Sequence, residues 1–288
     1  ARLEFKLRNG DAQKMTTLVS GGLGFIGSHL IDALMTHEKR VCVFDNLSSR
    51  TLENIIRWRD NPNLKIVKGD LLNTADLKKL KNNRFNVVYH LAANPEVRVG
   101  LTDPNVHFQQ NVVATHNLLE YLRQTKSTHS LVFTSTSTVY GEATKIPTPE
   151  DYGPQMPIST YGASKLASEA LISAYAHNYN YKAVIFRLAN IVGPRNPHGV
   201  VYDFIQKLNK NPKELEILGD GTQNKSYLHI DDCVKAMLLG LGKTENQVEI
   251  YNIGSEDQIT VKDIAKIVAE EMKTPHVKLN FTGGVDGG

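Results

Sequence analysis

Short apolar runs alternate with longer amphipathic segments along most of this chain. The runs are a few residues long and often β-branched, which is typical of strands buried on both faces of a sheet. The predicted strands cover residues 17–20, 40–44, 64–67, 86–91, 130–133 and 183–186. The predicted helices begin near residue 26 and cover residues 74–81, 105–124 and 160–179. This alternation predicts an α/β protein with a doubly wound parallel sheet.

The pattern changes after Asn190. Residues 193–199 are rich in glycine and proline, and shorter elements follow them. The predicted elements are a helix over 201–208, strands over 215–218 and 227–230, a helix ending at 241 and a last helix over 261–272. Thr260 and Asp263 have the spacing of a capping box for the last helix. We expect a smaller lobe over the strand ends.

The predicted organisation has two parts. Residues 1–14 are polar, carry no period and precede Met15, so we interpret them as an extension or a cloning remnant outside the fold. The large domain covers residues 15–190, and residues 227–243 return to it. The smaller, substrate-binding lobe covers residues 191–226 and 244–288.

Three glycines, Gly21, Gly24 and Gly27, separate the first predicted strand from the first predicted helix. Gly21 permits a tight turn, Gly24 lets the backbone approach a pyrophosphate, and Gly27 lets the helix lie near the strand. Free N–H groups at the helix start favour an anion. A glycine-rich turn that binds nothing is the alternative, and the spacing is not the commoner G-x-G-x-x-G. The motif predicts a dinucleotide site.

Asp45 ends the second predicted strand, 24 residues after Gly21. Dinucleotide-binding folds place the acid that holds the adenosine ribose hydroxyls at about this distance. A carboxylate there would repel a 2′-phosphate, which favours NAD over NADP. An ordinary turn residue is the alternative, and nearby Arg50 leaves the cofactor preference open.

Composition narrows the class of partner. The formal charge of +3 comes from interspersed signs, 33 basic against 30 acidic residues, so no nucleic-acid or membrane partner is indicated.

Cys42 and Cys233 lack metal-ligand spacing, and a reduced, cytoplasmic setting is expected. No run reaches the 18 or so apolar residues of a spanning helix. We interpret Asp231 and Asp232 as helix caps rather than metal ligands, and we expect no metal.

Tyr161 and Lys165 stand four residues apart and share one helix face. At about 5 Å and an effective dielectric near 20, the ammonium would stabilise a phenolate by roughly 3 kcal/mol. This would move the tyrosine pKa from about 10 towards neutrality, where the phenol works as a general base. A Tyr-x-x-x-Lys pair arises by chance about once in such a chain, so its position after the fifth strand matters more than the motif.

The fifth predicted strand ends in a cluster of hydroxyls, Thr-Ser-Thr-Ser-Thr over residues 134–138. Such a cluster is often only a polar strand end. Beside a dinucleotide site and the Tyr161–Lys165 pair, it predicts a catalytic centre instead.

Together these motifs resemble the extended short-chain dehydrogenase/reductases, within them the nucleotide-sugar epimerase and dehydratase group, and most closely the UDP-glucose 4-epimerases. The matching segments are residues 21–27, 43–46, 69–70, 90–93, 136–141, 161–165, 187–195 and 219–232. They cover nearly the whole range from Met15 to Gly283, which makes their order more specific than any one motif.

The resemblance implies a role for each site residue. Tyr161 would be the base on the sugar 4-hydroxyl, Lys165 would bind the nicotinamide ribose, and Thr136 would hydrogen-bond the same hydroxyl. Asn190 and Lys225 would contact the diphosphate of a UDP-sugar. The residues implied to bind NAD are Gly21, Gly24, Phe25, Ile26, Gly27, Asp45, Asn46, Ser48, Asp70, Leu71, Leu91, Ala92, Ala93, Asn111, Tyr161 and Lys165.

Three positions refine the expected reaction. Dehydratases of the group carry Thr-Asp-Glu where this chain has Thr136-Ser137-Thr138, and sugar-nucleotide decarboxylases keep the glutamate. The missing carboxylates favour redox-neutral 4-epimerisation, with UDP-glucose and UDP-galactose as the expected pair. Residues 94–98 and Lys225 depart from the usual pattern, and relatives continue past Gly288, so part of the lobe is expected to be truncated.

Several alternatives stay open. The sugar could be UDP-glucuronate or a UDP-N-acetylhexosamine, the reaction a net dehydrogenation, or the protein a non-catalytic NAD sensor. The resemblance also implies a homodimer through the helices predicted over 105–124 and 160–179. Apolar residues on these helices suit that pairing or could face the sheet: Val112, Leu118, Leu119, Leu122, Leu166 and Leu171.

Overall fold

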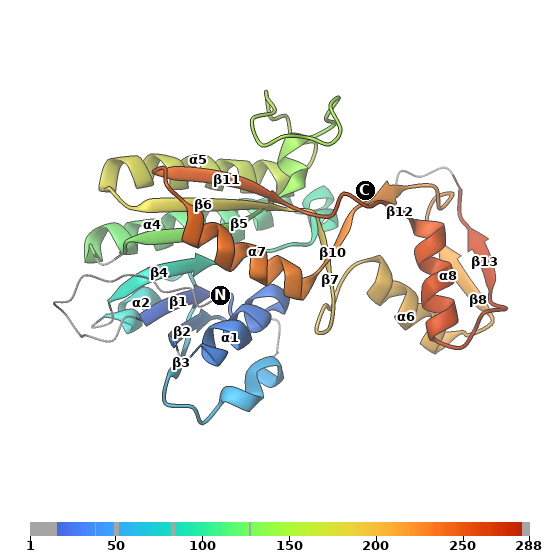
Figure 1. Ribbon diagram of the computed structural model, residues 1–288, viewed down its shortest axis with the longest axis horizontal. Coiled ribbons are helices and arrows are strands. Elements are labelled where there is room, and N and C mark those ends of the chain that lie inside the picture. Colours follow the sequence, from blue (N-terminus) through green and yellow to red (C-terminus); the bar gives the residue numbers. More distant parts are fainter. Residues whose placement is uncertain (1–15, 38, 49–51, 82–83, 127, 284–288) are drawn as a thin grey trace.

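The computed structural model describes residues 16–37, 39–48, 52–81, 84–126 and 128–283. The extension over 1–14 and Arg50 lie outside the described residues. Within those residues the main element is a seven-stranded parallel sheet with the order β11-β6-β5-β4-β1-β2-β3 (Figure 1). Its strands are β1 (Thr16–Ser20), β2 (Arg40–Asp45), β3 (Leu64–Lys68), β4 (Phe85–His90), β5 (Ser130–Thr136), β6 (Lys182–Leu188) and β11 (Val248–Ile253).

Helices cover both faces of this sheet (Figure 1). On one face, α1 (Phe25–Thr36) and α7 (Ile230–Lys243) pack on a core that includes Val19, Val43 and Val184. On the other face, α4 (Ala114–Thr125) and α5 (Thr160–Tyr179) pack on a core that includes Leu18 and Leu131. Successive strand residues point to opposite faces, so two covered faces require the continuous apolar runs seen in the sequence. The doubly wound α/β class is confirmed.

The seventh strand differs from the prediction. β11 pairs in parallel with β6, so residues 248–253 belong to the central sheet rather than to the smaller lobe assigned to 244–288. Its sequence, Val-Glu-Ile-Tyr-Asn-Ile, mixes polar and apolar positions because β11 lies at the edge of the sheet. Glu249 and Asn252 interrupt its apolar residues, so β11 lacks the continuous run from which the other six strands were predicted.

Two predicted helices are divided in the structure. Residues 74–80 form a short helix α2 (Thr74–Leu77) and a 3₁₀ turn η2 (Lys78–Leu80). Residues 104–125 form α3 (Pro104–His107), a π-helical segment η4 (Phe108–Val113) and then α4. A π turn changes the side-chain period over only a few residues, so the apolar pattern does not reveal it.

A smaller lobe extends from one end of the sheet (Figure 1). The helices α6 (Val200–Lys210) and α8 (Val261–Glu271) and the paired strands β8 (Glu214–Ile217) and β13 (Lys278–Phe281) enclose a separate apolar core. Two small pairs connect the parts: β7 (Asn190–Val192) with β10 (Tyr227–His229), and β9 (Asn224–Lys225) with β12 (Ile259–Thr260).

The helix caps follow the predictions only in part. The Thr260 hydroxyl accepts from the Asp263 N–H at 3.1 Å and donates to the Asp263 carboxylate at 2.7 Å, as expected. At α7 the capping residue is His229, whose ring accepts from the Asp231 N–H, whereas Asp231 and Asp232 lie in the first turn. In the first turn their negative charges still interact favourably with the positive end of the helix dipole. Among the described residues, no helix is long and apolar enough to cross a bilayer.

Candidate active site

The glycine turn between β1 and α1 has the geometry of a phosphate cradle. Gly21 has a φ of +70°, and a Cβ there would lie 2.6 Å from the Ala92 nitrogen. A Cβ on Gly27 would lie 2.3 Å from the Gly21 oxygen. At Gly24 the nearest atom would be 3.4 Å away, so this side of the turn is open. Gly24 is also the N-cap of α1 and offers no side-chain acceptor to the helix N–H groups of Phe25 and Ile26.

Asp45 connects this turn to β2. Its buried carboxylate accepts hydrogen bonds from the Leu23 N–H at 3.0 Å and the Leu47 N–H at 2.9 Å. Each carboxylate oxygen retains a further lone pair, so Asp45 has acceptor capacity for ribose hydroxyls. Asp45 thus has the hydrogen bonds of a turn residue, and it also lies at the edge of the sheet where the adenosine ribose is predicted to bind.

The residues predicted beside the adenosine gather at the same edge. The Asn46 side chain donates to the Asp70 carboxylate at 3.3 Å, and its oxygen accepts from the Ser48 N–H at 3.0 Å. Leu71 is buried, and its carbonyl accepts from the Asn117 side chain at 2.8 Å. The Leu91 N–H donates to the carbonyl of Ser20 on β1, which places Leu91 and the following Ala92 and Ala93 against the glycine turn.

Tyr161 and Thr136 meet at the end of β5. Tyr161 lies in the first turn of α5, and its phenol is close enough to the Thr136 hydroxyl for that hydroxyl to lower its pKa. Thr136 is buried and also accepts from the Thr138 N–H at 3.2 Å. The structure thus brings the predicted base together with the predicted hydroxyl.

The pKa of Tyr161 moves in the direction opposite to the predicted one. Burial raises it from 10.0 to about 12, and the neighbouring Thr136 hydroxyl only partly opposes the rise. The sequence argument counted the attraction of Lys165 but not the loss of water around the phenolate, and here desolvation is the larger effect.

Lys165 is itself buried, with its ammonium 4.1 Å from the centre of the Phe133 ring. Burial lowers its pKa from 10.5 to about 7, while the nearby Glu169 carboxylate raises it. Glu169 is held by Arg187 at 2.7 Å in a buried ion pair. Burial and the Glu169 carboxylate thus act on the Lys165 ammonium in opposite directions, and burial has the larger effect.

His90 was not singled out as a site residue by the sequence analysis. At the end of β4, its ring nitrogens hydrogen-bond to the Ser20 hydroxyl at 2.7 Å and the Thr115 hydroxyl at 2.8 Å. Burial, with Lys165 nearby, lowers its pKa to about 3, so the ring is neutral. His90 ties β1 to β4 and to α4 below the site. Its position at a strand end, beside Leu91, was the available signal.

Asn111, a predicted cofactor residue, also connects two parts of the protein. Its side-chain oxygen accepts from the Asn94 N–H at 2.7 Å, and its amide donates to the Ser164 hydroxyl at 2.9 Å. These bonds engage the side chain in joining the loop after β4 to α5. Ser164 could have been noticed because it lies between Tyr161 and Lys165.

Asn190 and Lys225 approach each other from β7 and β9. The Asn190 amide donates to the carbonyl of Ser226, the neighbour of Lys225, at 3.0 Å. Asn190 is exposed and Lys225 is half-buried. One amide and one cation thus stand where the smaller lobe joins the sheet, a pairing that suits a diphosphate.

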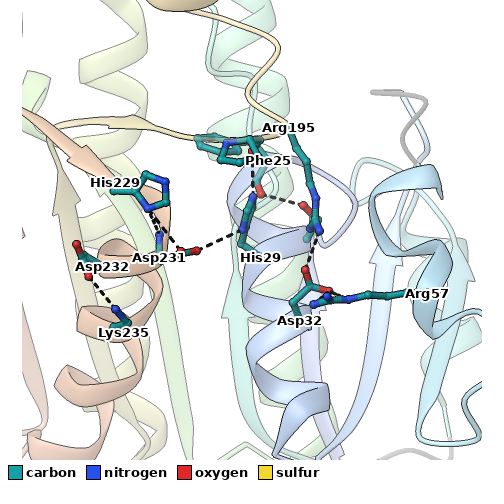
Figure 2. Close-up of polar contacts among 11 residues, drawn as sticks. Phe25, His29, Asp32, Arg57, Arg195, His229, Asp231, Asp232 and Lys235 are labelled. Atoms are coloured by element: carbon teal, nitrogen blue, oxygen red, sulfur yellow. Dashed lines mark hydrogen bonds and ion pairs between the residues drawn. The ribbon is translucent and has the colours of Figure 1, made fainter. Parts of the chain in front are cut away.

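The segment after β7 is anchored on α1 (Figure 2). The Asp32 carboxylate accepts from Arg195 at 2.8 Å, from Arg57 at 2.8 Å and from the Trp58 indole at 2.7 Å. One turn earlier, the His29 ring is 3.0 Å from the carbonyl of Pro194. The helix that begins at the phosphate cradle therefore also holds the chain that leads into the smaller lobe.

Comparisons with known proteins define the class. A family model described as the NAD dependent epimerase/dehydratase family matches residues 17–254. The chain belongs to this family, and the resemblance seen in its motifs is confirmed. It is an NAD-dependent isomerase of the nucleotide-sugar 4-epimerase type.

Three relatives illustrate the similarity. UDP-glucose 4-epimerase of Mycolicibacterium smegmatis is 31% identical over 91% of this chain and 84% of its own length. A crystal structure of UDP-galactose 4-epimerase is 43% identical, with a TM-score of 0.82 over 94% of this chain and 90% of its own. UDP-glucuronic acid 4-epimerase of Bacillus cereus, in complex with UDP-glucuronic acid and NAD, is 34% identical, with a TM-score of 0.84 over 95% and 88%.

Proposed function

We propose that the protein interconverts UDP-glucose and UDP-galactose through a transient 4-keto sugar. The observation that carries the proposal is the position of the Tyr161 phenol, which lies beside the buried Thr136 hydroxyl at the end of β5. Ser137 and Thr138 follow in place of the acid pair that dehydration requires. Proton transfer at a single sugar hydroxyl is the chemistry that this set of side chains supports.

Tyr161 acts as the base and Thr136 orients the sugar. The phenolate accepts the proton of the sugar 4-hydroxyl while Thr136 hydrogen-bonds the same oxygen, and Tyr161 returns the proton to that oxygen when the 4-keto sugar is reduced on its opposite face. NAD, when bound, supplies the hydride acceptor at C4 and a positive ring that favours the phenolate. Lys165, when protonated, would add a positive charge that favours the phenolate over the phenol.

The remaining residues hold the two ligands. Gly24 with the start of α1 would bind the pyrophosphate of NAD, and Asp45 with Asn46 would bind its adenosine ribose. Asn190 and Lys225 would bind the diphosphate of the UDP-sugar. The open face of Gly24 and the spare acceptor capacity of Asp45 support these assignments.

The sugar itself decides between this proposal and its closest alternative. The Bacillus cereus relative carries a UDP-hexuronate, so UDP-glucuronate is the second candidate, and UDP-N-acetylglucosamine the third. Purified protein is incubated with each sugar nucleotide, and the epimers are separated by chromatography. Formation of UDP-galactose from UDP-glucose at the highest kcat/KM supports the proposal; a higher value for UDP-glucuronate would replace it. Accumulation of NADH without epimers would indicate a net dehydrogenase.

A homodimer through α4 and α5 remains part of the proposal. The apolar residues Leu118, Leu119 and Leu122 are buried in the sheet core, so they do not form the interface. Exposed aromatic side chains on the same side of the fold, Phe108 and Tyr179, support it instead. Light scattering across a concentration series tests the dimer.

Two free, buried cysteines suit a reduced compartment, and we propose the cytoplasm and a place in galactose metabolism.

A further inference from the structure

A buried histidine, His107, lies directly beside the proposed base. Its exposed fraction is 1%, and its ring centre is 5.7 Å from that of Tyr161. One ring nitrogen, Nδ1, is 2.8 Å from the Thr160 hydroxyl, and the other, Nε2, is 3.0 Å from the Glu96 carbonyl. The ring thus spans from the loop after β4 to the residue that precedes Tyr161.

The two partners fix the tautomer of the neutral ring. A carbonyl oxygen only accepts, so the Nε2–H donates to Glu96 and Nδ1 is left without a proton. Nδ1 therefore accepts from the Thr160 hydroxyl. Both nitrogens are satisfied, as a side chain with this burial requires.

Close packing around this contact leaves it little freedom. A Cβ added to Gly100 would lie 2.0 Å from the Thr160 hydroxyl oxygen and 2.9 Å from Nδ1 of His107. Only a residue without a side chain fits there, so the loop lies against the His107–Thr160 pair. The other end of the loop is fixed by Asn111, which bonds to the Asn94 N–H.

The helix that carries His107 changes geometry immediately after it. α3 ends at His107, and the π-helical segment η4 (Phe108–Val113) begins at the next residue. Both His107 and Asn111 reach α5 from this stretch, through Thr160 and Ser164. A π turn inserts an extra residue into the helical period, and such turns recur at functional sites.

We propose that His107 is a positioning residue that sets the spacing between the loop at residues 94–101 and the base Tyr161. This inference rests on the proposed epimerase function. Because the loop follows β4, it borders the same edge of the sheet as Thr136 and Tyr161. A fixed loop holds the sugar against the phenol, and displacement of either by about 1 Å costs on the order of a hundredfold in rate.

The test compares variants that remove one or both ends of the contact. His107→Ala removes both and is expected to lower kcat per bound NAD on the order of a hundredfold, with KM within about threefold of the original. His107→Gln keeps a donor for the Glu96 carbonyl and loses the Thr160 bond, as Thr160→Val does. Each of these should lower kcat by about tenfold, and the double variant should lower it no further, because both changes remove the same bond.

The matched control is His177→Gln, an exposed histidine near the end of α5. It should leave kcat, KM and NAD content unchanged. Losses that multiply in the His107→Gln/Thr160→Val double variant would overturn the proposal. So would a full kcat in His107→Ala once rates are divided by the fraction of protein that retains NAD.

Hydrogen exchange separates this inference from the epimerase assignment. Amides over residues 94–101 should exchange faster in His107→Ala and Thr160→Val than in the original protein or the His177→Gln control. If the original protein converts no UDP-sugar and exchange is nevertheless faster in the two variants, the proposed function is refuted, but the role of His107 in fixing the loop is supported. Unchanged exchange together with unchanged kcat in an active enzyme would refute the role of His107 alone.

Discussion

The two ends of the site are built from different materials. At the β1–α1 turn the backbone forms the predicted binding surface. Gly21 has a left-handed conformation, Gly27 is in close contact with the turn, and the helix starts after Gly24. At the β5–α5 end the work falls to side chains, the phenol of Tyr161 and the ammonium of Lys165. Binding at the first end depends on steric fit, and the chemistry at the second depends on the protonation states of Tyr161 and Lys165.

This contrast explains what each end tolerates. A backbone cradle is disrupted by any added atom that collides with it, whatever the charge of that atom. At the side-chain end the protonation of a half-buried phenol and a buried ammonium matters as well, because burial already moves both pKa values by about 2 or more from their ordinary values. Substitutions at the two ends should therefore fail in different assays.

The largest effect is expected at the side-chain end, from Tyr161→Phe. Removing the phenol oxygen removes the general base, so kcat should fall by about 10³. NAD content and Tm should stay close to those of the original protein, because the ring still packs beside His107. Epimer separation and the absorbance of bound cofactor measure the two quantities. An unchanged kcat in this variant would show that Tyr161 is not the base.

At the backbone end, Gly27→Ala should destabilise the fold by about 3 kcal/mol. Its Cβ would lie 2.3 Å from the Gly21 oxygen, which belongs to the backbone and cannot rotate away. Gly24→Ala is the matched control, since its nearest neighbour is 3.4 Å away and its φ is −70°. The control should unfold within about 0.5 kcal/mol of the original and yet bind NAD more weakly. Urea titration and calorimetry check the pair; equal stability of both variants would contradict the cradle geometry.

Lys165→Met should change how stability depends on pH. The pKa of Lys165 is lowered from 10.5 to about 7 in the folded protein. Between these values the unfolded chain binds the proton and the folded chain does not, so unfolding free energy rises with pH, by up to about 1.4 kcal/mol per pH unit. The variant should lack this rise between about pH 7 and 9. Urea titrations across that window test it, and parallel curves for the two proteins would show that Lys165 is not neutralised by burial.

The smallest effect is expected where the two ends meet the lobe, from Lys225→Arg. A guanidinium can bind a diphosphate through two parallel hydrogen bonds, whereas an ammonium acts as a point charge. KM for the UDP-sugar should fall by about two- to fivefold with kcat unchanged. Steady-state kinetics measure this, and an unchanged KM would place Lys225 outside the diphosphate site.

The sequence predicted the backbone end more completely than the side-chain end. Glycine spacing and the acid after β2 are local features, and six of the central strands follow from their apolar runs. β11 was missed because Glu249 and Asn252 interrupt its apolar residues. The Tyr161 pKa was misjudged because burial is set by packing between β5, α5 and the loop after β4, which are far apart in sequence. His107 carried no signal at all, since its partners are 11 and 53 residues away.

The Asp32 cluster gives α1 a second task. Its first turn faces the phosphate cradle, and its third turn grips the chain that runs from Asn190 towards α6 through Arg195. Any displacement of α1 would therefore also displace the chain that leads into the smaller lobe. We therefore expect the smaller lobe and the glycine turn to unfold in a single cooperative transition while NAD is bound, because Asp32 connects α1 to the chain that enters the lobe.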